Sequence, residues 1–197
     1  MSHRYTLAAV LFVTLVGCSN PTSVNSPPAR ITVPDTPATA TPKPALPTSV
    51  DIPSIGVHAT KLMPLGLAKD GTIETPPLSQ PQTLGYYTRA SPPCVPGPNK
   101  VPFALIGHID GNKQRGVLYN LKNLKPGDAV TIGLDNGKSC TYRINKLAQY
   151  EKQDAPVQDV WGPTADAQIR VISCGGPYIG PPYYYRDNLN GMGSLVS

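Results

Sequence analysis

Cys174 and His108 are the two residues whose type and position best suit chemistry. Cys174 ends an apolar stretch over residues 169–173 and is followed by Gly175 and Gly176, which let a substrate or another backbone approach closely. The thiolate is the reactive form of cysteine, and a neighbouring His or Arg usually supports it. His108 follows a buried-type apolar run. A nucleophilic Cys with a His partner is one interpretation; a small buried Cys and a structural His is the other.

The other histidines are weaker candidates for the same role. His3 lies in the N-terminal segment, and His58 follows a stretch that Pro and Gly interrupt. One Cys and one His without a paired spacing such as Cys-x-x-Cys do not form a closed metal site. We therefore expect no metal and no cofactor.

The elements that must position these residues are short strands between turns. Strands are predicted over residues 50–57, 72–75, 101–107, 129–134, 139–144, 168–173 and 183–189, with short helices over 116–124 and 157–161. Many short strands separated by turn residues are typical of a β-sandwich or a closed β-barrel. Residues 51–197 have the length of one such domain with a single core.

Composition excludes several classes of protein. Hydrophobic residues make up 40% of the chain and charged residues 15%, so the whole chain is not disordered. From Asp51 onward, 14 Lys and Arg stand against 11 Asp and Glu without a basic block. Such a weak and dispersed charge argues against nucleic-acid binding. No apolar run reaches the length of about 18 residues that a membrane-spanning helix needs.

Residues 1–18 have the organisation of an export signal. A basic start at Arg4 precedes an apolar run over residues 5–16. The run ends in Leu-Val-Gly-Cys, which resembles a bacterial lipobox, and by that resemblance Cys18 would become the lipidated N-terminus. An unlipidated signal with a chance Cys is the alternative. The resemblance places the protein outside the cytoplasm, anchored by lipid to the outer face of the cell membrane.

Residues 19–50 are predicted to be a disordered linker. Between Pro21 and Val50 there are eight Pro and nine Ser or Thr, but no aromatic residue. Such a segment cannot bury enough apolar surface to offset the entropy of ordering it. The chain is therefore divided into a signal peptide (1–18), a linker (19–50) and a folded domain (51–197).

Cys94 and Cys140 remain after the signal and the candidate nucleophile are set aside. Two further cysteines in an exported chain favour a disulfide between them. Two unpaired thiols are the alternative, because the sequence does not give the Cα separation that a disulfide requires.

Six segments in order resemble landmarks of the sortase family, most closely the class F sortases of actinobacteria. They are residues 52–57 (IPSIGV), 64–71 (PLGLAKDG), 107–110 (GHID), 124–128 (LKPGD), 172–176 (ISCGG) and 185–188 (YRDN). The resemblance covers nearly all of the domain. It implies a closed, eight-stranded β-barrel with one or two short helices, which agrees with the strand pattern.

The resemblance also implies roles for particular residues. Cys174 would be the nucleophile, His108 its acid/base partner and Arg186 the electrostatic stabiliser; a surface Arg paired with Asp187 is the alternative for Arg186. The substrate would be a surface protein with a Leu-Pro-x-Thr-Gly-like sorting signal, and an amine of the cell wall or a peptide would accept it. We expect a monomer. The residues expected to contact the substrate are Asp110, Ser173, Gly175 and Tyr184.

Two features depart from the family pattern. Ser173 stands where many sortases have Thr. After Arg186 the family continues in an apolar strand, whereas residues 189–197 here contain Asn and two Gly, which weaken strand propensity. The length of the last strand is therefore open, and a sortase-fold binding module with weak or no turnover is the alternative function. An L,D-transpeptidase fits less well, because its Ser-x-Gly-Cys signature is absent around Cys174.

Overall fold

The computed structural model describes residues 43–98, 100–181 and 184–196. The predicted signal peptide, Cys18 and most of the predicted linker lie outside these residues. The first strand begins at Pro47, four residues before the predicted boundary at Asp51. That boundary is too late, because Val50 is 1% exposed and is paired on both sides in the sheet. The alternating burial of this segment outweighs its Pro-rich composition.

The described residues form eleven strands and three short helical elements, so the mostly-β prediction is confirmed. The strands are β1 Pro47–Ile52, β2 Val57–Ala59, β3 Leu62–Leu65, β4 Leu84–Tyr87, β5 Phe103–Ile106, β6 Asp110–Gly111, β7 Gln114–Arg115, β8 Ala129–Leu134, β9 Ser139–Glu151, β10 Gln168–Gly180 and β11 Tyr184–Leu195. The helical elements are η1 Pro53–Ile55, η2 Leu121–Asn123 and α1 Val157–Trp161. The last two fall where the sequence predicts short helices.

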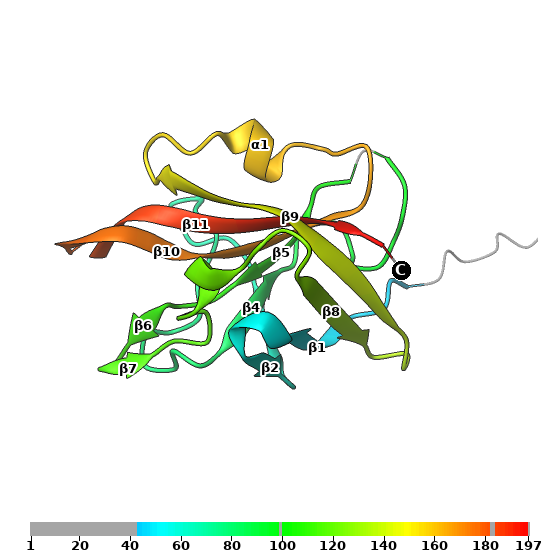
Figure 1. The fold of residues 1–197 in the computed structure, drawn as a ribbon, viewed down its shortest axis with the longest axis horizontal. Helices are drawn as coiled ribbons and strands as arrows, with labels where there is room; N and C mark the ends of the chain where they lie inside the picture. The colour runs from blue at the N-terminus through cyan, green and yellow to red at the C-terminus, as the bar shows by residue number, and fades with distance from the viewer. Residues whose placement is uncertain (1–42, 99, 182–183, 197) are drawn as a thin grey trace, which may run out of the picture. The chain divides into compact units, whose positions relative to one another are not determined.

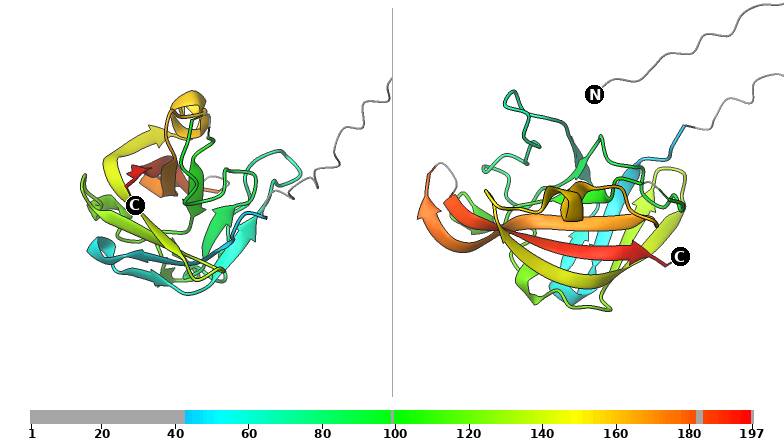
Figure 2. Two further views of the ribbon diagram at one scale, coloured as in Figure 1. Left: turned by 90° about the vertical axis from the view of Figure 1, so that its right-hand side faces the viewer. Right: turned by 90° about the horizontal axis from the view of Figure 1, so that it is seen from above.

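Nine of these strands form one sheet in the order β2-β1-β8-β9-β11-β10-β5-β4-β3, while β6 and β7 form a separate ribbon (Figure 1). The two edge strands, β2 and β3, are consecutive in the chain. The sheet curls round so that its two edges approach each other, and Figure 2 shows it as a nearly closed barrel. The β-barrel prediction is confirmed. The sheet has nine strands, one more than the resemblance implies. The first predicted strand is divided into β1 and β2 by η1 and Gly56, which has a φ of 73°.

The core lies inside the barrel, where residues of nearly every strand meet. Its largest fully buried side chains include those of Tyr142, Ile52, Leu84, Leu105, Ile132, Ile144 and Ile169. A second, smaller cluster joins Val160 of α1 to Ile172 of β10 and Met192 of β11. Because side chains alternate along a strand, this second cluster marks the opposite face of β10 and β11 from the barrel core.

Arg170 fastens α1 to that outer face. Its side chain is almost fully buried, and its guanidinium donates hydrogen bonds to the carbonyls of Asp159 and Val160 at 3.1 and 3.0 Å. A buried guanidinium is tolerated only when its donors are satisfied. The helix thereby covers the face of β10 on which Ile172 lies, two residues before Cys174.

The last strand, β11, is long and continuous in spite of its Asn and Gly residues. It pairs with β10 on one side and with β9 on the other, from Asp187 to Leu195 on the β9 side. Its glycines are required by packing. A Cβ on Gly191 would lie 2.6 Å from Cδ2 of Leu124, and a Cβ on Gly193 would lie 2.6 Å from the carbonyl oxygen of Arg143. Weak strand propensity is therefore compensated by close approach of neighbouring elements.

Replacing Gly193 with Ala should lower the free energy of unfolding by about 1–3 kcal/mol, because the new methyl group must displace backbone. Urea unfolding followed by far-UV circular dichroism measures this change. Ser139→Ala, at an exposed position on β9, is the control and should change stability by less than about 0.5 kcal/mol. Equal stability of the Gly193 variant and the wild type would show that the β9 and β11 backbones can move apart at this point without loss of stability.

Candidate functional site

Cys174 lies on β10 at the point where the neighbouring strand β5 has ended. The two strands are parallel, and their last registered pair is Ile172 with Ile106. The thiol side chain is partly exposed, and among the described residues it is the free cysteine. Ser173 is 3% exposed, and its hydroxyl donates a hydrogen bond to the carbonyl of Gly107 at 2.7 Å. Ser173 therefore ties β10 to the chain beyond β5 and does not face a substrate.

His108 stands two residues beyond β5 and is 9% exposed. Its backbone is held firmly, because its carbonyl accepts a hydrogen bond from the N–H of Leu118 at 2.9 Å. Gly116 allows this contact: a Cβ there would lie 2.1 Å from the same carbonyl oxygen. The ring nitrogen Nε2 is hydrogen-bonded to the carbonyl of Pro76 at 2.5 Å. The ring is thus engaged by the segment that precedes β4.

The register of β5 and β10 brings His108 and Cys174 to the same level of the sheet. His108 comes two residues after Ile106, and Cys174 comes two residues after its paired residue, Ile172. The N–H of Gly107 continues the pairing by donating to the carbonyl of Ile172 at 3.2 Å. Among the described residues, no hydrogen bond joins the two side chains themselves. The two residues thus follow neighbouring strands at the same level, and the His108 ring is bonded to Pro76.

Arg186 of β11 is 46% exposed and is occupied by carboxylates. Its Nε donates to Oδ1 of Asp187 at 2.6 Å, and a further nitrogen lies 3.4 Å from Oε1 of Glu151. The hydrogen bond from Arg186, followed by one from Gln149, holds the pKa of the Asp187 carboxyl below its usual value. The pairing with Asp187 that the sequence suggested as an alternative is present, and no hydrogen bond from Arg186 reaches Cys174 in the described residues.

Asp110 is bonded by Tyr185, not by Tyr184. The Tyr185 hydroxyl donates a hydrogen bond to Oδ2 of Asp110, which raises the pKa of Tyr185 to about 12. The Tyr185 ring also contacts Tyr178 edge-on, with centroids 5.5 Å apart. Tyr184 is 42% exposed and has a φ of 56°. Alternation along β11 accounts for the difference, since neighbouring tyrosines point to opposite faces.

The two glycines after Cys174 allow close packing against β11. Gly175 is paired with Asp187, and a Cβ on it would lie 3.3 Å from Cβ of Leu189. Gly176 has a φ of 71°, and a Cβ there would lie 2.2 Å from Oδ2 of Asp187. The glycines therefore let the buried Asp187 carboxylate lie directly beneath the chain that leaves Cys174.

Lys152 is a residue of this site that sequence reasoning missed. It follows β9 directly, and its Nζ lies 3.7 Å from Sγ of Cys174. Its backbone N–H donates to the carbonyl of Arg186 at 3.1 Å. The strand predicted here ends at Ile144, well before Lys152, and the contact depends on β11 lying between β9 and β10, which no local pattern indicates.

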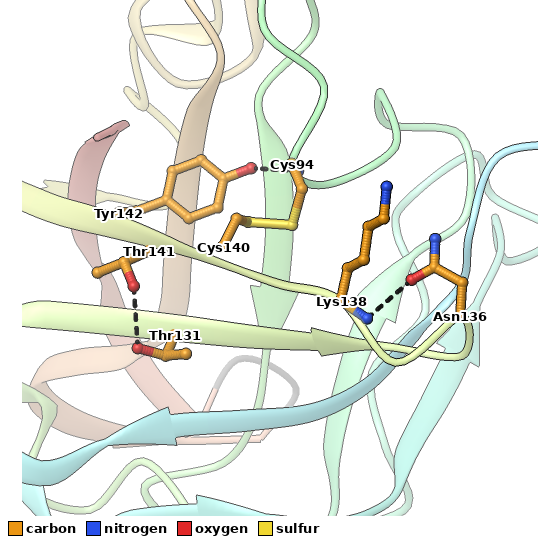
Figure 3. Close-up of a disulfide and its surroundings, with 7 residues drawn as sticks. All are labelled: Cys94, Thr131, Asn136, Lys138, Cys140, Thr141 and Tyr142. Atoms are coloured by element: carbon orange, nitrogen blue, oxygen red, sulfur yellow. Dashed lines mark hydrogen bonds between the residues drawn. A yellow bond between two sulfur atoms is a disulfide. The ribbon is translucent and has the colours of Figure 1, made fainter. Parts of the chain in front are cut away.

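Cys94 and Cys140 form a disulfide with a Cα separation of 5.5 Å (Figure 3). It joins the Pro-rich loop before β5 to the start of β9. Next to it, the backbone N–H of Cys94 donates to the hydroxyl of Tyr142 at 2.9 Å, and burial raises the pKa of Tyr142. The loop is therefore fixed to the barrel by a covalent bond and a buried hydrogen bond.

Removing this disulfide in the double variant Cys94→Ala/Cys140→Ala should cost about 4 kcal/mol of unfolding free energy, the loop-entropy value for a sequence separation of 46. Chemical denaturation of both proteins measures the loss. Thiol titration of the denatured wild type without reductant is the accompanying test. Labelling of Cys94 or Cys140 in that titration, together with unchanged stability in the variant, would contradict the cross-link.

Two hollows are present among the described residues, and neither includes Cys174. A depression of about 390 Å³ is lined by Asp110, Gly111, Lys113, Gln114, Arg115 and Tyr119. A smaller one of about 80 Å³ is lined largely by Pro and aromatic residues, among them Pro44, Tyr86, Pro92 and Phe103. The first shares Asp110 with the Tyr185 contact, so it adjoins the face of the site beyond His108.

Within residues 43–98, 100–181 and 184–196, no group of three His, Cys, Asp or Glu side chains is placed to hold a metal ion. The helices of this same part of the chain are too short or too polar to cross a membrane. Cys18, the expected lipidation site, lies outside the described residues.

Comparison with known proteins identifies relatives of this fold. A sequence profile of the sortase domain family matches residues 50–189. Among solved structures, sortase C1 from Streptococcus agalactiae superposes with a TM-score of 0.57 at 20% identity, covering 76% of this chain and 67% of that one. Sortase C-1 from Actinomyces oris superposes with a TM-score of 0.56 at 21% identity, covering 79% of this chain and 76% of that one. A lid mutant of sortase A from Corynebacterium diphtheriae superposes with a TM-score of 0.56 at 20% identity, covering 82% of this chain and 74% of that one. No curated protein matches the chain significantly.

Proposed function

The chain belongs to the sortase family, and we propose that it is a cysteine transpeptidase acting on surface proteins. It would cleave a Leu-Pro-x-Thr-Gly-like sorting signal through a thioacyl-enzyme at Cys174 and transfer the acyl group to an amine. The observation that supports this proposal is the parallel register of β5 and β10, in which His108 and Cys174 each come two residues after the last registered pair, Ile106 and Ile172.

The proposed chemistry begins at the sulfur. The Cys174 thiolate attacks the Thr carbonyl carbon, and the electron pair of the carbonyl bond moves to oxygen. Arg186 would donate hydrogen bonds to that oxygen, for which its fixed charge and its donors are suited. When the oxyanion collapses, the bond to the Gly nitrogen breaks, and His108 as imidazolium gives that nitrogen a proton. An acceptor amine then attacks the thioester and releases Cys174; water can do the same.

Two side chains must move for this sequence of steps. His108 has to exchange the carbonyl of Pro76 for the leaving nitrogen. Arg186 has to turn at least one donor from Asp187 or Glu151 toward the substrate. Catalytic hydrogen bonds are often loose or absent before the substrate is bound. Substrate binding would thus complete the site.

The finer assignment follows from the sequence. We propose a class F-like enzyme that is exported by its signal peptide and attached through lipid on Cys18, with the linker as a tether. The catalytic domain would work as a monomer without metal or cofactor. This assignment is supported by the lipobox-like end of the apolar run and by the six ordered segments.

A sortase-fold binding module is the second candidate, and a specific observation favours it. Both His108 and Arg186 are engaged by other groups of the chain, and a protein that kept them so would bind a sorting signal without cleaving it. Turnover therefore separates the two functions.

The test uses the full chain and a panel of quenched fluorescent Leu-Pro-x-Thr-Gly peptides, with and without triglycine. We expect cleavage between Thr and Gly, a ligated product only when triglycine is present, and a thioacyl adduct on Cys174 by mass spectrometry. Cleavage that yields the free acid alone, even with triglycine, would replace transfer by hydrolysis. Binding of the peptides without any cleavage would establish the binding module.

A further inference from the structure

We propose that Lys152 is a further catalytic residue, whose ammonium group holds the sulfur of Cys174 as a thiolate before substrate is attacked. The inference rests on the proposed function and deepens it. Its starting observation is the hydrogen bond from Nζ of Lys152 to Sγ of Cys174 at 3.7 Å.

The sheet register explains why these two residues meet. On β11, Asn188 is paired with Cys174 on one side and with Tyr150 of β9 on the other. Directly paired residues point to the same face, and Lys152 follows Tyr150 by two positions, so it continues on that face. The backbone bond from Lys152 to the carbonyl of Arg186 extends the pairing to this residue. A lysine side chain is long enough to span the intervening strand and reach the sulfur.

The two cations near Cys174 have different partners. Arg186 is bound by Asp187 and Glu151, while Lys152 donates to the sulfur. Asp187 is 1% exposed, and the charge of Lys152 also helps to lower the pKa of this carboxyl. The roles of the two cations thus differ: the guanidinium contacts carboxylates, whereas the ammonium contacts the sulfur and also adds positive charge near Asp187.

This division suits the order of the reaction. An ammonium group attracts a thiolate and hydrogen-bonds to it, whereas it gains little from a neutral thiol. Once the sulfur is acylated, the negative charge has left it, and the attraction ends. Lys152 would therefore act on the nucleophile in the resting enzyme, and Arg186 on the oxyanion afterwards.

Other charged or titratable groups lie on the elements that flank Cys174 and must be considered in any pH measurement. They are His108 beyond β5, Tyr150 and Glu151 on β9, and Tyr185, Arg186 and Asp187 on β11. Of these, Tyr185 is bonded to Asp110, and Arg186 is bonded to both Asp187 and Glu151. None of these pairings uses the Lys152 side chain.

The test measures alkylation of Cys174 by iodoacetamide from pH 5 to 10 in the full chain, with the modified residue located by peptide mapping. Lys152→Met should slow the reaction at pH 7 by about tenfold and move the midpoint of the pH–rate curve upward by about one unit. Lys152→Arg should restore most of the rate. Lys146→Met, at an exposed position on the same strand, is the control and should match the wild type.

Superimposable pH–rate curves for the wild type and Lys152→Met would overturn the proposal. If the Met variant has a lowered melting temperature, Lys152→Gln replaces it in the same measurement. Peptide assays separate the two levels of inference. We expect the variant to lose about tenfold in kcat/KM with KM unchanged. A wild type that is alkylated in a Lys152-dependent way but cleaves no peptide would leave this proposal standing and refute the transpeptidase.

Discussion

Replacing Cys174 with alanine is expected to abolish cleavage of the sorting-signal peptide, with a loss of at least about 10⁴-fold in kcat/KM. Without the sulfur no thioacyl intermediate can form, and the remaining groups can only bind the peptide. Cys174 is partly exposed and lies just beyond the paired part of β5 and β10, so the smaller side chain of alanine fits at this position. The variant should therefore fold normally, and continuous fluorescence measures its residual rate.

Two accompanying measurements make this result informative. The alanine variant should still bind the peptide with an affinity within about threefold of the wild type, because its other side chains are unchanged. Cys174→Ser should also be almost inactive, since a hydroxyl is a far weaker nucleophile than a thiolate at neutral pH. Appreciable cleavage by the alanine variant would place the nucleophile on another residue.

Replacing His108 with glutamine is expected to lower kcat by about 10²–10⁴-fold, the usual contribution of general acid–base catalysis. A glutamine amide can donate a hydrogen bond to the carbonyl of Pro76, as the ring nitrogen can, so the local fold should persist. It cannot transfer a proton to the leaving nitrogen. Steady-state kinetics with the peptide should show the loss in kcat, with a smaller change in KM.

His58 provides a matched control for this substitution. Its side chain is 66% exposed and bonded to Asp51, on the first two strands of the sheet. His58→Gln should leave kcat within about twofold of the wild type. A thioacyl-enzyme that accumulates normally in the His108 variant would show that the imidazole acts in release and not in acylation.

The positions of Cys174 and His108 could be predicted because each is tied to a local pattern. An apolar run of strand length precedes both residues, and glycine marks the end of each run. The hairpin of β8 and β9 could be predicted for the same reason, from alternation and an Asp-Asn-Gly turn. The pairing of Arg186 with Asp187 involves neighbours in the sequence, so it could be named as an alternative from the beginning.

The contacts that could not be predicted depend on strand order. Lys152 reaches Cys174 only because β11 is inserted between β9 and β10, which no local pattern reveals. The contact between His108 and Pro76 comes from a Pro-rich loop without periodicity. Because of its Pro-rich composition, the first part of β1 falls in the predicted linker. Its pairing with β8 depends on residues far away in the sequence. Local sequence thus identified the candidate nucleophile and base, but not the groups that contact them.

The position of β11 has a consequence for how the protein matures. This strand is the last element of the described chain, yet it fills a central place in the sheet, between β9 and β10. A ribosome delivers the chain from the N-terminus, so β9 and β10 each have one unpaired edge until β11 emerges. Such edges invite association with other chains. The barrel can close, and Cys174 can acquire its neighbours on β9 and β11, only after β11 has been delivered.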